Sequence, residues 1–211
     1  AVPCAYRPDS VTVRSGATSR AFVSMAATPD QDVTRLMACW REGDAAARSA
    51  LIDMVYANVR AIAGQSLRQM PAPTLSATDV AHEALLRILG ADASWESRRH
   101  FYHVVAQATR QVLVDAARRR MADKRGSGAE HVELNAALNL GAGQSDSALV
   151  RLDAALEELA QAHARRAQMI ELVYFGGLNR NEVAATLAVS EGTVDRDLRL
   201  ARAWLRAAIE A

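Results

Sequence analysis

Cysteine, aromatic residues and long apolar runs are all scarce in this chain of 211 residues, and each scarcity excludes a class of protein. The two cysteines, Cys4 and Cys39, are too few for the disulfide framework of a small secreted domain. No apolar run approaches the roughly 18 to 20 residues of a membrane-spanning helix, and the amino end lacks the apolar core of a signal peptide. We therefore expect a soluble cytoplasmic protein without membrane contact.

The motifs of common enzyme classes are also missing. The chain contains no GxGxxG, P-loop, HExxH or nucleophile-elbow pattern, so we do not expect an enzyme. His100 and His103 stand three residues apart, but no third ligand lies near them in the sequence, and surface histidines explain them better than zinc ligands. The sequence predicts neither a cofactor nor a bound metal.

What the chain does contain favours helices. Hydrophobic residues make up 50% of the chain and aromatic residues 5%, and Ala, Leu and Arg, which are strong helix formers, abound together with Val. Two helices joined near residues 43–44 should precede a helix over about 77–89 and a longer one from about 97 to 120, because apolar residues recur there at helical spacing. Ser76 and Thr78 are good caps for the third of these helices.

The pattern divides the chain into two helical domains. We predict a disordered tail over residues 1–29, a four-helix domain over 30–125, a flexible linker over 126–147 and a second domain over 148–211. The linker prediction depends on two Gly-rich stretches and an excess of acids. The fold class is therefore all-α, with two small domains joined by a flexible linker.

The net charge of +1 conceals an uneven distribution. Residues 95–125 carry eight basic and three acidic side chains, a local charge of +5, whereas residues 25–94 carry six and eight, a local charge of −2. A basic cluster on one predicted helix is typical of a surface that binds a polyanion. The two segments should meet different partners.

Residues 178–205, LNRNEVAATLAVSEGTVDRDLRLARAWL, have the pattern of a helix-turn-helix. Asn179 and Ser190 can cap the two helices. The apolar face of the second helix should comprise Val194, Leu198, Ala201 and Leu205. Its basic edge comprises Arg196, Arg199, Arg202 and Arg206.

Other features of this segment leave alternatives open. Asp195 and Asp197 would repel phosphate and halve the charge of the helix, although Asp195 could accept a hydrogen bond from cytosine. An ordinary amphipathic hairpin with solvated arginines would also fit the pattern.

Three segments together resemble a known family. TDVAHEALLRIL (78–89), FYHVVAQATRQVLVDAARRR (101–120) and GLNRNEVAATLAVSEGTVDRDLRLARAWL (177–205) occur in the order found in extracytoplasmic-function (ECF) sigma factors of bacterial RNA polymerase. The resemblance covers residues 30–211. It implies a transcription initiation factor that binds core RNA polymerase and directs it to promoters, recognising minus-35 and minus-10 elements and assisting strand opening.

The resemblance also implies roles for individual residues. The contact with the clamp helices of the largest polymerase subunit would be made by Asp79, Glu83, Leu86 and Arg87. The minus-10 element would be bound by Arg98, Arg99, Gln111, Arg118, Arg119 and Arg120. The minus-35 element would be bound by Arg180, Thr193, Asp195, Arg196, Arg199 and Arg202. Trp95, Phe101 and Tyr102 could stack on a flipped base, although the spacing of Phe101 favours the core.

Regulation and the alternative functions complete the expectations. Many family members carry further acids ahead of the position of Asp79. A phosphate on Thr78, added by a Ser/Thr kinase, would restore that negative charge. Simple helix capping by Ser76 and Thr78 is the alternative explanation of these two residues. An anti-sigma factor is the other expected regulator. The alternative functions are an autonomous helix-turn-helix regulator and a purely helical adaptor.

Overall fold

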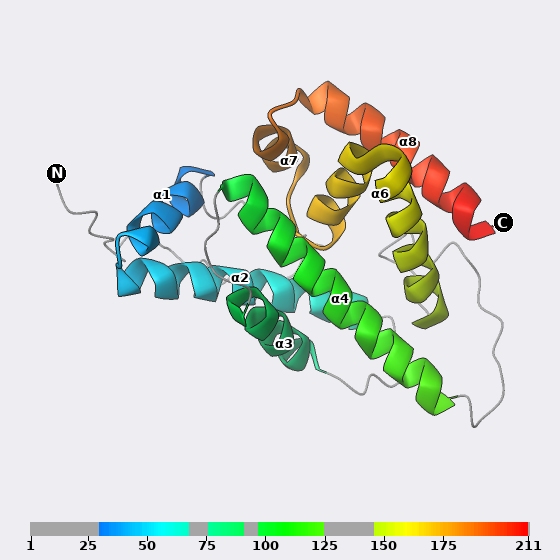
Figure 1. Cartoon of the computed structure of the whole chain (residues 1–211), viewed down its shortest axis with the longest axis horizontal. Coiled ribbons are helices and arrows are strands. Elements are labelled where there is room, and N and C mark those ends of the chain that lie inside the picture. Colours follow the sequence, from blue (N-terminus) through cyan, green and yellow to red (C-terminus); the bar gives the residue numbers. More distant parts are fainter. Residues whose placement is uncertain (1–29, 68–75, 91–96, 125–145, 211) are drawn as a thin grey trace, which may run out of the picture.

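The computed structural model describes residues 30–67, 76–90, 97–124 and 146–210. In these ranges the chain forms seven helices and no strand, which confirms the all-α prediction (Figure 1). The helices are α1 (Asp30–Arg41), α2 (Ala45–Leu67), α3 (Ala77–Gly90), α4 (Arg98–Lys124), α6 (Asp146–Tyr174), α7 (Arg180–Leu187) and α8 (Glu191–Glu210). The expected tail lies outside the described residues, and so does the expected linker up to residue 145. No helix in the described ranges is long and apolar enough to cross a bilayer.

The turn between α1 and α2 lies where the sequence predicts it. Gly43 has a φ of +92°, which a side chain would disfavour, and Asp44 follows it as the cap of α2. The Asp44 carboxylate accepts hydrogen bonds from the backbone N–H groups of Ala46 at 2.8 Å and Ala47 at 3.1 Å. Two otherwise unpaired N–H groups at the start of α2 are thereby satisfied.

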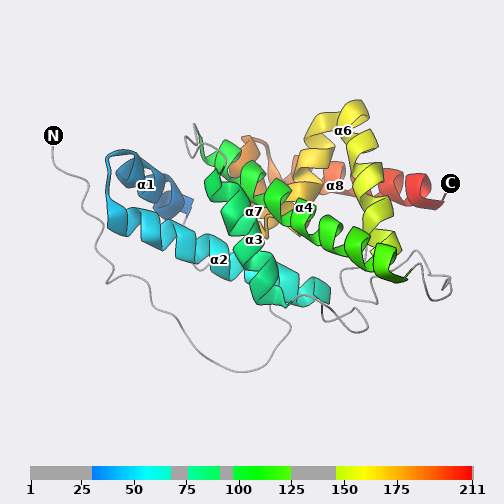
Figure 2. The same ribbon diagram turned by 60° about the horizontal axis from the view of Figure 1, so that its bottom comes forward.

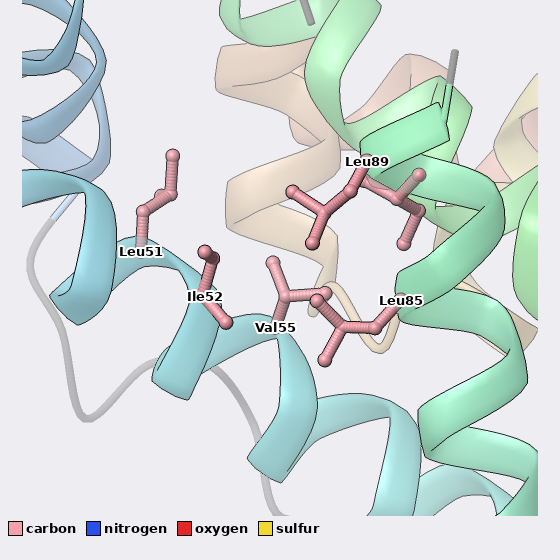
Figure 3. A pocket seen from close by; sticks show the side chains of 6 residues that line it. Leu51, Ile52, Val55, Leu85 and Leu89 are labelled. Carbon is pink, nitrogen blue, oxygen red and sulfur yellow. The ribbon is translucent and has the colours of Figure 1, made fainter.

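Helices α2 and α3 pack through aliphatic side chains. Figure 3 shows Leu51, Ile52 and Val55 of α2 facing Leu85 and Leu89 of α3 around a small apolar pocket. Most of this lining is buried, so the pair forms a firm base for the exposed side of α3.

The two halves of the chain share one hydrophobic core. Helix α4 packs on α3 and also on α6, and α4 and α6 lie side by side in both views of the molecule (Figures 1 and 2). One contiguous cluster of buried residues includes Leu51 and Phe101 from the first half and Leu156 and Ile170 from the second. The halves therefore fold as packed neighbours in this structure.

A second contact between the halves joins α2 to the turn after α6. The side-chain amide of Asn58 donates a hydrogen bond to the carbonyl oxygen of Gly176 at 2.8 Å, in a buried position. The next residue, Gly177, has a φ of +69°, and a Cβ atom there would lie 2.5 Å from the Asn58 Oδ1 atom. Glycine is therefore required at residue 177 by both backbone conformation and space.

We expect Gly177→Ala to lower the free energy of unfolding more than Gly43→Ala. Both substitutions place a side chain at positive φ, at about 1 to 2 kcal/mol each. Only Gly177→Ala also displaces Asn58, because nothing lies within 4 Å of a Cβ atom at residue 43. The free energy of unfolding should therefore fall by about 1 kcal/mol more in Gly177→Ala than in Gly43→Ala, which is the contribution of one hydrogen bond.

Urea denaturation of both variants measures the difference. In an Asn58→Ala background the excess cost of Gly177→Ala should disappear. An excess that persists without the Asn58 side chain would show that the proposed contact is not its cause.

Candidate functional site

The helix-turn-helix predicted over 178–205 is present as α7 and α8. The Asn179 side chain accepts from the Glu182 N–H at 3.0 Å, and the Glu182 carboxylate accepts from the Asn179 N–H at 2.7 Å, a reciprocal capping box. Ala188 then adopts a left-handed conformation, with φ of 53°, which ends α7. The Ser190 hydroxyl accepts from the Thr193 N–H at 3.2 Å and so caps α8. Both predicted caps are confirmed.

The two faces of α8 differ as the spacing predicts. The predicted inward residues Val194, Leu198, Ala201 and Leu205 are all buried. On the opposite side Arg196 and Arg199 are exposed. Arg202 is half-buried, with its guanidinium 5.7 Å from the centre of the Tyr174 ring. The first half of α8 thus presents guanidinium groups to solvent over an apolar support.

The two aspartates of α8 have different environments. Asp195 is exposed and lies 3.1 Å from the Arg180 guanidinium, which offsets its charge. Asp197 is buried, with its carboxylate 2.7 Å from Arg165 and 3.6 Å from Arg166. The prediction that both aspartates weaken an anion-binding face is therefore wrong for Asp197, which points into the protein and holds α8 against α6.

The outer side of α3 carries one exposed apolar residue among charges. Leu86 is 72% exposed, more than any other large hydrophobic residue in the described ranges. Beside it, the Glu83 carboxylate and the Arg87 guanidinium lie 2.7 Å apart, and Arg87 also reaches Asp115 of α4 at 2.9 Å. Burial lowers the pKa of Arg87, but the hydrogen bonds to Asp115 and Glu83 raise it by more. The pKa of Arg87 therefore lies above its ordinary value.

Ser76 is the cap of α3. Its hydroxyl accepts from the Asp79 N–H at 3.1 Å, and the Asp79 carboxylate accepts from the Ser76 N–H at 2.8 Å. Hydrogen bonds from the backbone and side chain of Ser76 lower the pKa of Asp79. Thr78 lies one residue inside α3 and is half-buried. The capping explanation therefore holds for Ser76.

The first turns of α4 place the predicted minus-10 residues in several environments. Arg98 is half-buried, with its guanidinium 5.3 Å from the centre of the Tyr102 ring. Arg99 is exposed and donates to the Gln168 side chain of α6 at 2.8 Å, and Gln111 is exposed. Phe101 and Tyr102 are both buried, as the spacing predicts for Phe101, so neither ring is accessible to a base in this conformation. Trp95 lies outside the described residues.

The three consecutive arginines of α4 point to different neighbours. Arg118 is exposed over half its side chain and lies 2.9 Å from Asp153 of α6. Arg119 is more exposed and lies 3.7 Å from Glu83 of α3. Arg120 is buried, with its guanidinium 2.8 Å from the Asp146 carboxylate. Only the first two are accessible to a ligand while α6 is in place.

A buried ionic cluster that the sequence analysis did not anticipate joins α4 to α6. The Arg110 guanidinium lies 3.3 Å from Asp153 and 3.4 Å from Glu171, and all three side chains are nearly inaccessible to solvent. Burial raises the pKa of both acids, although the charge of Arg110 opposes that shift. Asp153 stands at helical spacing with Leu149, Leu152 and Leu156, and Glu171 interrupts the apolar run MIELVYF. Acids on such faces indicate buried cationic partners.

His103 is half-buried at the edge of this cluster, with its Nδ1 atom 3.6 Å from the Glu171 carboxylate. Burial, together with the nearby His100 and Arg99, lowers the pKa of His103. The prediction of two surface histidines is therefore right for His100, which is exposed, and wrong for His103. Among the residues placed by the structure, no group of three or more His, Cys, Asp or Glu side chains could hold a metal ion.

Comparison with known proteins gives one match. The family model described as ECF sigma factor matches residues 30–211, which span every described helix. No curated protein and no solved structure matches the chain.

We expect Arg110→Ala to lower the free energy of unfolding by about 3 to 5 kcal/mol at neutral pH, because it leaves buried carboxylates without their central cation. The loss should shrink as the pH falls from about 7 toward the carboxylate range near 4. Burial raises the pKa of Asp153 and Glu171, so both acids take up protons at a higher pH than ordinary carboxyl groups do, and a neutral acid needs no cation.

Urea denaturation at several pH values measures this dependence. Arg119→Ala is the matched control, because its side chain is 61% exposed and its loss should change stability by less than about 0.5 kcal/mol. A deficit for Arg110→Ala that stays constant with pH would contradict the assignment.

Proposed function

Because the chain belongs to the ECF sigma factor family, and so acts as a sigma factor in transcription initiation, we propose a division of that work among three helices. In this proposal α8 reads the minus-35 duplex, α4 holds the minus-10 strand, and α3 binds the clamp helices of the largest polymerase subunit. The observation that carries the proposal is the exposed pair Arg196 and Arg199 on a capped and firmly supported α8.

The role of α8 follows from its chemistry. Guanidinium groups bind the guanine edge bidentately in the major groove, which admits a helix. Arg196 and Arg199 are one helical turn apart and exposed, so both suit base reading. Arg180, at the start of α7, contacts Asp195 of α8 and, with Arg202 and the N-terminal turn around Thr193, suits contacts to the phosphate backbone. The pairing of Asp195 with Arg180 keeps its charge from opposing DNA.

The role of α3 follows from the exposure of Leu86. An exposed leucine flanked by Asp79, Glu83 and Arg87 combines apolar area with charges that fix orientation, the usual composition of a protein interface. Figure 1 places α3 and α8 on opposite sides of α4, so the two contacts can be made at once. A phosphate on Thr78 would add charge beside Asp79 and remains part of the proposal.

In-vitro transcription with core polymerase and genomic fragments, followed by mapping of start sites, tests the proposal as a whole. We expect start sites that share an upstream element, and we expect Arg196→Ala and Arg199→Ala each to weaken discrimination at one or two positions of that element by about 1 to 3 kcal/mol.

Arg151→Ala, an exposed arginine of α6 outside the motif, is the matched control and should leave promoter preference unchanged. Unchanged preference in both α8 variants would exclude α8 as the reading helix. Promoter footprints made by the protein without polymerase would favour the autonomous regulator instead.

We expect Leu86→Ala to weaken binding to core polymerase by about tenfold, which corresponds to about 1.4 kcal/mol. The free energy of unfolding should change by less than about 0.5 kcal/mol. The side chain is mostly exposed, so its removal leaves no cavity. Fluorescence anisotropy of the labelled protein against core polymerase measures the affinity. Leu200→Ala on α8, where the side chain is 43% exposed, controls for the loss of an exposed leucine. Equal affinities for the two variants would place the polymerase contact elsewhere.

A further inference from the structure

The face of α4 that meets α6 holds basic side chains opposite acidic ones. Arg110, Arg118 and Arg120 of α4 contact carboxylates of α6 that lie between 26 and 61 residues away in the sequence. The shortest of these contacts are 2.8 Å, from Arg120 to Asp146, and 2.9 Å, from Arg118 to Asp153. Three carboxylates along α6 thus meet three guanidinium groups along α4.

Carboxylates in this arrangement resemble the partners that a nucleic-acid strand would offer. Phosphate oxygens and carboxylate oxygens both accept paired N–H bonds from guanidinium groups. Arg118 and Arg120 belong to the basic segment that the proposed function assigns to the minus-10 strand. While α6 is packed, Arg120 is buried, and the half-exposed Arg118 is paired with Asp153. A strand that bound both arginines would therefore have to displace carboxylates of α6.

The reading helix is outside this contact. Arg196 and Arg199 of α8 are exposed in the same structure. The ion pairs between α6 and α8 have the opposite polarity, because Arg165 and Arg166 of α6 contact the buried Asp197 of α8. The packing of α6 therefore occupies part of the proposed strand-binding side, at Arg118 and Arg120, and leaves the proposed duplex-binding side open.

We propose that α6 competes with single-stranded DNA for α4. The carboxylates of Asp146, Asp153 and Glu171 take the places of backbone phosphates on Arg110, Arg118 and Arg120. The packed chain can meet duplex DNA through α8 but holds a single strand on α4 only after α6 has moved away. This inference rests on the proposed role of α4.

The contact is suited to reversal. Burial raises the pKa of Asp153 and of Glu171, which means that desolvation offsets much of what their ion pairs contribute. A phosphodiester remains charged and solvated while it binds, so it can replace these acids without that penalty. Other polar contacts between the halves include the buried hydrogen bond from Asn58 to Gly176 and the exposed one from Arg99 to Gln168.

Two variants should open the contact by different means. Asp153→Asn with Glu171→Gln removes both charges opposite Arg110 and keeps the shapes of the side chains. Asn58→Ala removes the second contact without changing the charge of the protein. Glu157→Gln with Glu158→Gln is the matched control, because both are exposed acids of α6 and their replacement changes the net charge equally.

Two measurements on the full chain test the proposal. Small-angle X-ray scattering reports separation of the halves, and fluorescence anisotropy reports affinity for a labelled single-stranded oligodeoxynucleotide and for its duplex. We expect both opening variants to expand and to bind the single strand about tenfold more tightly, with duplex affinity unchanged. The control pair should stay compact and gain less than about twofold on the single strand, by general charge alone. Adding Arg118→Ala to an opened variant should remove most of its gain.

Each failure has a separate meaning. Variants that keep their helical circular dichroism and stay compact would show that these contacts do not hold the halves together. Variants that expand without gaining single-strand affinity would show that α6 does not compete with DNA. Transcription by the wild-type protein with core polymerase tests the proposed function independently. If transcription is promoter-specific and either of these failures is observed, the competition by α6 is overturned and the proposed function is not.

Discussion

The burial of charge between α4 and α6 is the constraint on which the arrangement of the molecule depends. Arg110 lies between Asp153 and Glu171 in a position where none of the three could stay ionised alone. Each acid therefore requires α4 to be present, and Arg110 requires α6. The surrounding apolar residues supply attraction without direction, whereas this cluster fixes which face of α6 meets α4.

A chain of ion pairs extends from this cluster to the surface of α3. Asp153 pairs with Arg118, Arg118 lies 3.9 Å from Asp115, Asp115 pairs with Arg87, and Arg87 pairs with Glu83. The side chains proposed for polymerase contact and those proposed for the DNA strand thus share carboxylates. A partner that draws Glu83 or Arg87 toward itself changes the charge around Arg118, so the two surfaces are electrostatically linked.

Local features of the fold were predictable and long-range pairings were not. Helix positions followed from apolar periodicity, and the caps at Asn179 and Ser190 followed from side chains that bond their own backbone. The inward orientation of Asp197 could have been predicted, because this residue stands on the same side of α8 as Val194 and Ala201. Its partner could not, because Arg165 lies 32 residues earlier in the chain. No periodicity specifies which cation a buried acid will meet, since that depends on how the helices cross.

The same distinction explains why one proposed nucleic-acid surface is open and the other is partly covered. The arginines of α8 rest on a helix-turn-helix that is held together by its own caps, its apolar face and the pairing of Asp197 with α6. Arg196 and Arg199 need no neutralising partner, because they already lie in solvent. The arginines of α4 lie on a face whose apolar residues must be buried, so whatever covers those residues must also supply carboxylates. In a chain whose charges nearly balance, α6 provides both, and for that reason the helix that stabilises the core is also the competitor that we propose for the strand.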